Sequence, residues 1–114
     1  MGGLISTYAA CRYPDIFTKV AAISSGYFRN QEEMEKMISS ANLTNIKRFY
    51  LDCGTNEFGE SEINSAFLQS NQTVYEMINR KVSNSMFRTI DNGKHEYTFF
   101  KKRIPEIMTY LFAE

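Results

Sequence analysis

The sequence lacks the features that mark nucleic-acid-binding and membrane-spanning proteins. Its 13 basic and 13 acidic residues leave no formal net charge, whereas nucleic acids and anionic membranes attract proteins with a basic excess. No apolar run approaches the ~20 residues of a membrane-spanning helix. The first residues also lack the basic start and apolar stretch of a secretory signal. We therefore expect a cytoplasmic protein that binds neither nucleic acid nor membrane.

Cysteine is scarce as well. Cys11 and Cys53 form no C-x-x-C pair and no metal-ligand set, so we expect two buried free thiols rather than a disulfide. The one dense run of like charge is Lys101-Lys102-Arg103, and such a run is typical of a solvated helix face. The length of 114 residues suits one domain with one core.

Apolar spacing along the chain predicts alternating helices and strands. The unbroken apolar run Val20–Ile23 is typical of a parallel strand that is covered on both faces. Pro14 ends the first helix, and Pro105 either kinks the last helix or divides it in two. The pattern predicts strands over 18–25, 46–53 and 85–91 and helices over 3–13, 31–40, 63–82 and 97–112. This alternation predicts an α/β fold with three parallel strands flanked by helices.

Polar residues follow each predicted strand, and ligands of open parallel sheets bind beyond the carboxyl ends of the strands. His95, the chain's one histidine, follows the third strand, and Glu57 follows the second. An acid and a histidine at neighbouring strand ends make two of the three groups of a nucleophile–base–acid system. From the residues alone, His95 is as readily a hydrogen-bonded structural residue, and a loop glutamate such as Glu57 is usually solvated.

Three stretches of the sequence are similar to one known family. The opening MGGLISTYAACRYPDIFTKVAAISSGYF resembles the segment that follows the nucleophile in a G-x-S-M-G-G elbow. YLDCGTNE resembles the family's strand and acid loop, and DNGKHEYTFFKKRIPEIMTYLF resembles its histidine loop and closing helix. In this order they resemble the C-terminal part of an α/β-hydrolase esterase. The group concerned is the putative esterase group, which includes esterase D-like, feruloyl-esterase-like and enterochelin-esterase-like enzymes.

The resemblance implies a serine esterase that hydrolyses a small-molecule carboxylic ester without a metal or an organic cofactor. It makes His95 the general base and Glu57 the acid of the triad. The family often has Asp at the acid position, but both acids are used in this fold. Asp52 and Asn56 remain open alternatives for the acid.

The same resemblance implies that the nucleophilic serine stands immediately before Met1, whose backbone N–H would belong to the oxyanion hole. Ser25, Tyr27 and Phe28 would line the substrate pocket. We therefore expect residues 1–114 to be the C-terminal portion of an α/β-hydrolase domain, a partial α/β-hydrolase fold that is inactive by itself. The alternative is a non-catalytic interaction or assembly module that keeps half of a hydrolase fold.

A partial sheet would leave apolar surface uncovered. The strand around Val20–Ile23 would have one unpaired edge, with neither charge nor proline to discourage pairing. Leu4, Ile5 and Tyr8 of the first helix would be partly bare. We expect a twofold homodimer that joins these strand edges or exchanges the N-terminal helix.

Overall fold

Helices and strands alternate along the whole of residues 1–113, which are the residues that the computed structural model describes. The order and type of the predicted helices and strands are confirmed, with ends within two residues of those expected. Pro105 lies inside one continuous C-terminal helix, and a short 3₁₀ turn, η1, lies between the first predicted strand and the helix at 31–40, where neither a helix nor a strand is predicted. The elements are α1 (Gly2–Arg12), β1 (Lys19–Ile23), η1 (Tyr27–Asn30), α2 (Gln31–Ser40), β2 (Arg48–Gly54), α3 (Ser61–Lys81), β3 (Ser85–Ile90) and α4 (Tyr97–Phe112).

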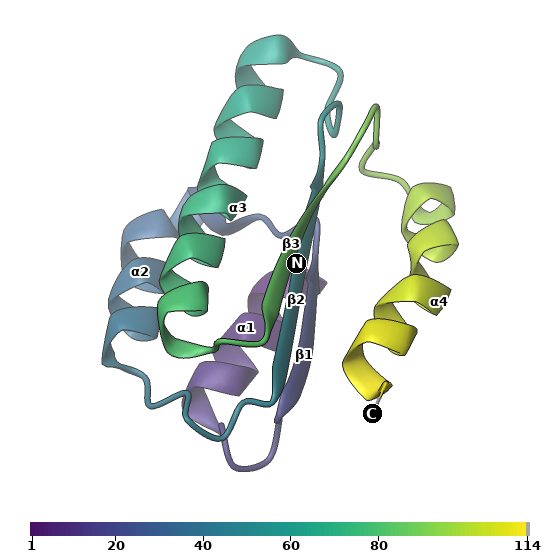
Figure 1. The fold of residues 1–114 in the computed structure, drawn as a ribbon. Helices are drawn as coiled ribbons and strands as arrows, with labels where there is room; N and C mark the ends of the chain where they lie inside the picture. Colours follow the sequence, from purple (N-terminus) through teal and green to yellow (C-terminus); the bar gives the residue numbers. More distant parts are fainter. Residues whose placement is uncertain (114) are drawn as a thin grey trace.

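The three strands form one parallel sheet in the order β1-β2-β3. Val20 is aligned with Phe49, and Tyr50 with Met86. All residues of β2 from Phe49 to Gly54 are buried, as its central position requires. The sheet lies between two helical layers: α1, α2 and α3 cover one face, and α4 covers the other (Figure 1). The expected partial α/β fold is therefore confirmed.

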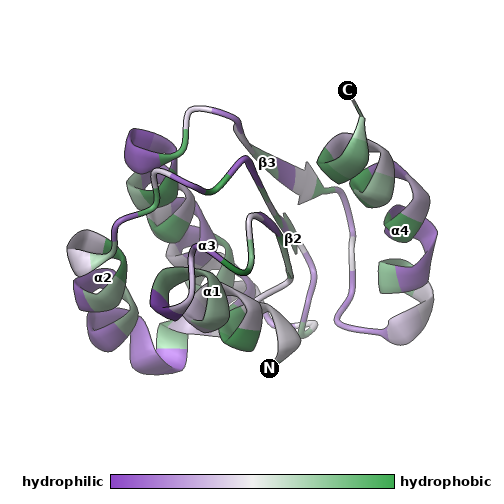
Figure 2. Cartoon of the chain, turned by 90° about the horizontal axis from the view of Figure 1, so that it is seen from below, coloured by the Kyte–Doolittle hydropathy of each residue, from purple (hydrophilic) through white to green (hydrophobic). Residues whose placement is uncertain are grey.

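The two faces of the sheet bury cores of very different size. The alternation of β1 directs Val20 and Ala22 toward α1–α3, whereas Ala21 and Ile23 pack with α4. The core under α1–α3 contains fourteen buried residues, and the core under α4 contains three: Tyr50, Ile107 and Leu111. Figure 2 shows α4 alone on its side of the sheet.

Helix α4 corrects one expectation about charge. Lys101 and Lys102 are exposed as predicted, but Arg103 is only 6% exposed, so the basic run is not wholly solvated. Arg103 lies four residues before Ile107 and eight before Leu111, and this spacing places all three on the stripe that faces the sheet. The helical period therefore places the two lysines in solvent and the arginine against the sheet, although the three are consecutive in sequence.

Both cysteines are buried free thiols, as predicted. Burial raises the pKa of Cys11 to about 11 and raises that of Cys53 further above its ordinary value. Within residues 1–113 we find no cluster of three or more His, Cys, Asp or Glu side chains that could hold a metal ion. None of the helices in the same range has the length and apolar character needed to cross a bilayer.

Candidate active site

The loops that follow β2 and β3 bring Glu57 and His95 into direct contact. Nδ1 of His95 lies 2.8 Å from Oε1 of Glu57, and the His95 backbone N–H donates to the Glu57 carbonyl at 3.0 Å. The Glu57 side chain is fully buried, and that of His95 is 36% exposed. Because an ionised carboxylate only accepts hydrogen bonds, Nδ1 carries the proton in the neutral ring, and Nε2 keeps the lone pair of a base.

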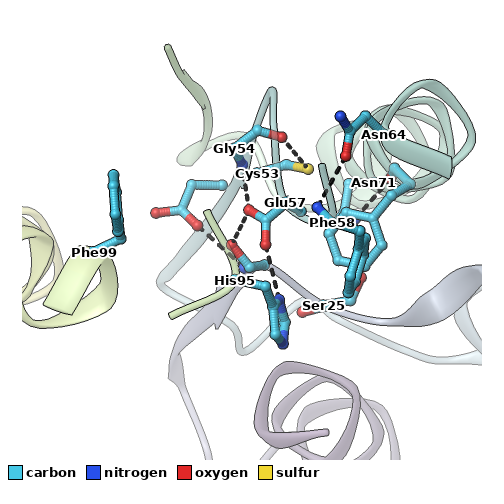
Figure 3. A network of polar contacts seen from close by, with 12 residues as sticks. Ser25, Cys53, Gly54, Glu57, Phe58, Asn64, Asn71, His95 and Phe99 are labelled. Atoms are coloured by element: carbon cyan, nitrogen blue, oxygen red, sulfur yellow. Dashed lines mark hydrogen bonds and ion pairs between the residues drawn. The ribbon is translucent and has the colours of Figure 1, made fainter. Parts of the chain in front are cut away.

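Gly54, the last residue of β2, allows the two loops to approach this closely. A Cβ atom at position 54 would lie 2.2 Å from the carbonyl oxygen of Gly93 and 2.6 Å from Oε2 of Glu57. The Gly54 N–H donates to that same Oε2 at 2.6 Å, and the Asn56 N–H donates to the Gly93 carbonyl at 3.1 Å. Figure 3 shows Glu57 between Gly54 and His95. Any larger residue than glycine would separate the acid loop from the histidine loop.

The other two candidates for the third triad position, Asp52 and the amide Asn56, form no hydrogen bond with His95. Asp52 accepts two hydrogen bonds from Arg103, Nε to Oδ2 at 2.7 Å and Nη2 to Oδ1 at 2.9 Å. It also accepts one from the Tyr50 hydroxyl at 2.6 Å. Burial, followed by the Asp52 charge, raises the pKa of Tyr50 above its ordinary value. The side-chain oxygen of Asn56 accepts from an amide on α3. Glu57 is therefore the acid that the geometry pairs with the histidine.

An apolar cavity of about 490 Å³ opens beside the imidazole. The Phe58 ring stacks on His95, with centroids 5.2 Å apart and planes at 23°, and the Phe67 ring stands edge-on at 6.1 Å. Leu4, Phe28 and Ile63 also line the cavity, alongside Met1. Such a space holds the apolar part of a small molecule next to a proton acceptor.

Only one of the three residues expected to line a pocket does so. Phe28 lies on the cavity wall, but Ser25 and Tyr27 are fully buried and do not reach it. The Tyr27 hydroxyl lies 2.6 Å from that of Thr7 inside the core. Ser25 lies beneath α1, where a Cβ on Gly3 would come within 1.8 Å of its Oγ. The tight packing of α1 therefore turns both side chains away from the cavity.

The resemblance assigns Met1 to the oxyanion hole, and the structure places it on the wall of the cavity beside His95. It precedes α1 and lines the same cavity as His95, and its carbonyl accepts the N–H of Ile5 at 3.1 Å. Sequence reasoning did not assign Phe58 and Phe67 to the site. Phe58 directly follows Glu57 in the acid loop, which is the one signal that could have identified it.

Comparison with known proteins identifies the family. The model of the family described as "Putative esterase" matches residues 1–111. The chain belongs to this putative esterase family. It is 25% identical over 118 residues to the uncharacterized protein YbbA of Bacillus subtilis (strain 168), an alignment that covers the whole chain and 47% of YbbA. No solved structure matches the chain significantly. This member of the putative esterase family thus spans about half the length of the curated relative that it matches.

Proposed function

We propose that the chain supplies the base and the acid of a Ser-His-acid triad in an enzyme that hydrolyses carboxylic esters. The observation that carries the proposal is the 2.8 Å contact between His95 Nδ1 and a fully buried Glu57 carboxylate. In the reaction, Nε2 of His95 takes the proton of a serine that attacks the ester carbonyl, and later gives that proton to the leaving alcohol. Glu57 holds the ring in the required tautomer and stabilises the imidazolium that forms.

We further propose that the nucleophilic serine belongs to a segment that precedes Met1 in the intact enzyme. Met1 lines the cavity beside His95, and the matched relative is about twice as long as this chain. Two serines line a neighbouring cavity together with His95, and both already donate elsewhere: Ser6 to the Gly2 carbonyl at 2.9 Å, and Ser24 to Glu57 at 2.7 Å. The backbone N–H of Met1 would then stabilise the oxyanion.

The apolar cavity wall supports the proposed binding of an ester. Phe28, Ile63 and Leu4 offer apolar contacts, and Phe58 keeps one face of the imidazole out of water. A small-molecule ester would place its apolar part against this wall and its carbonyl near Nε2 of His95. Desolvation of this kind strengthens the electrostatic interactions of the acid–base pair.

The test compares the chain with a longer protein that includes the codons upstream of Met1 in the same reading frame. Hydrolysis of p-nitrophenyl acetate and labelling by a fluorophosphonate are measured on both. We expect turnover and labelling only in the longer protein, and a loss of roughly 10⁴-fold or more on His95→Ala or Glu57→Gln. Glu60→Gln is the matched control, because Glu60 is exposed at the end of the same loop.

Two results would contradict the proposal. A longer protein that hydrolyses the ester equally well with alanine at position 95 would show that His95 is not the base. A stop codon in frame before Met1, with no turnover by the purified chain above that of its His95→Ala variant, would favour a non-catalytic assembly module instead.

A further inference from the structure

Ser24 connects the candidate acid to the opposite face of the sheet. It follows β1, is 1% exposed, and its hydroxyl donates to Oε2 of Glu57 at 2.7 Å. The same hydroxyl oxygen accepts a hydrogen bond from Nη2 of Arg103 at 3.2 Å. Arg103 belongs to α4, whereas α1–α3 lie on the other side of the sheet (Figure 1). Ser24 and Arg103, which are 79 residues apart in sequence, therefore meet beside the candidate acid.

The chemistry of the three groups fixes the direction of these hydrogen bonds. A serine hydroxyl has one proton to donate and lone pairs with which to accept, whereas a guanidinium only donates. Because Arg103 occupies an acceptor site on Ser24, the hydroxyl proton is directed to the Glu57 carboxylate. Hydrogen bonds with a charged partner are stronger than neutral ones, and both bonds of Ser24 have such a partner. The donor on Oε2 is thus held in place from α4.

The backbone of Ser24 is strained to achieve this placement. Its φ of 46° lies in the left-handed region, which favours glycine. The Ser24 N–H donates to Asp52 twice, to the backbone oxygen at 3.1 Å and to Oδ1 at 3.2 Å. Asp52 also accepts both bonds of the Arg103 fork. The Asp52 carboxylate therefore fixes both the backbone of Ser24 and Arg103, which donates to the Ser24 hydroxyl. Strained backbone conformations cluster at functional sites, so the side chain of Ser24 is a candidate for a functional role.

We propose that Ser24 is a positioning residue whose hydroxyl, directed by Arg103, fixes the Glu57 carboxylate so that Oε1 accepts Nδ1–H of His95. This rests on the proposed function, in which that contact sets the tautomer of the base. Without the hydroxyl, Oε2 of Glu57 retains only the Gly54 N–H among the donors described above. With one of the two donors to Oε2 lost, the carboxylate is held less firmly, and the bond to His95 weakens.

The experiment uses the single histidine of the chain as a probe. In ¹⁵N-labelled protein, one pair of imidazole nitrogen signals reports the tautomer of His95, and the Nδ1 proton reports its exchange with water. We expect Ser24→Ala and Ser24→Gly to speed that exchange about five- to tenfold, as for the loss of one buried hydrogen bond. Both variants should also shift the signals toward a mixture of tautomers.

The two variants separate positioning from structural support. Glycine suits a φ of 46° and alanine does not, so Ser24→Gly should melt about 4 °C above Ser24→Ala while showing the same change at His95. Ser25→Ala is the matched control: its buried Oγ has no hydrogen-bond partner among residues 1–113, and its loss should leave the His95 signals unchanged. Arg103→Lys keeps the charge without the planar fork and should give a smaller change in the same direction.

Unchanged His95 signals in both Ser24 variants would overturn the inference, whatever their melting temperatures. If Ser24→Ala does not fold, Ser24→Gly decides the question, because its backbone is compatible with the native conformation. The signals are recorded without an ester. Altered His95 signals in the Ser24 variants therefore support the positioning role even if the longer protein shows no esterase activity. That lack of activity would refute only the proposed function.

Discussion

Replacing Gly54 with alanine should damage the fold and the site together. The added Cβ would lie 2.2 Å from the Gly93 oxygen, 2.6 Å from the Gly93 carbonyl carbon and 2.6 Å from Oε2 of Glu57. Ordinary carbon contacts begin near 3.5 Å, so the loop that carries His95 must retreat by roughly 1 Å or more. Overpacking of this kind costs about 1–3 kcal/mol. Two of the three clashes involve backbone, which cannot rotate away, and we expect the upper part of that range.

A loss of about 2–3 kcal/mol corresponds to a fall in Tm of about 10 °C for a chain of this size. Thermal unfolding followed by circular dichroism measures it, and NMR of His95 should show the Nδ1 proton exchanging faster. Gly26→Ala is the control, because a Cβ there meets nothing within 4 Å and the Gly26 φ is −85°. If Gly54→Ala has the same Tm as Gly26→Ala and its His95 signals are unchanged, the close approach of the two loops does not require glycine at position 54.

Three further predictions follow from burial and from the open sheet edge. Burial raises the pKa of Tyr27 to about 12 from an unfolded value near 10, so its contribution to the free energy of unfolding is intact below pH 10 and is lost as pH rises to 12. The loss is about 1.4 kcal/mol per pH unit, and chemical denaturation of Tyr27→Phe should show a shallower decline there. Because burial raises the pKa values of Cys11 and Cys53, both should resist Ellman's reagent until the chain unfolds, and fast labelling of the native protein would contradict their burial. We propose that the isolated chain dimerises through the free edge of β1. Sedimentation at micromolar concentration should show a dimer, and Ala21→Lys should weaken it. Ala22 is fully buried and is therefore unsuitable for a charge. A folded monomer would refute the dimer.

Local sequence patterns were sufficient for the order of the elements. Val20–Ile23 and the β2 segment form buried strands because short, nearly unbroken apolar runs are typical of parallel strands that are covered on both faces. The predicted helix 31–40 matches α2 to the residue, and the two acids in its first turn suit the positive end of the helix dipole. Family resemblance, rather than spacing, singled out Glu57 from Asp52, because both are acids at the end of the same strand.

Contacts between distant residues could not be read from the sequence. Nothing local distinguishes Arg103 from the two lysines before it, and its burial depends on an aspartate 51 residues away. In the sequence, Ser24 is only one of several polar residues at the end of a predicted strand. Its contacts with Glu57 and Arg103 depend on how α4 packs on the sheet. The inward direction of Tyr27 likewise depends on the packing of α1, and periodicity carries no information about it.

The unequal cores on the two sheet faces have a consequence for motion. Fewer buried apolar contacts mean a smaller free energy of local opening, so α4, over three buried residues, should separate from the sheet more readily than α1–α3, over fourteen. Opening would take Arg103 away from Asp52 and leave a buried carboxylate without its cation, which is costly. That ion pair therefore opposes the opening of α4, and we expect Arg103 to direct the Ser24 hydroxyl only while α4 stays on the sheet. Amide exchange in α4 would measure the lifetime of the aligned site.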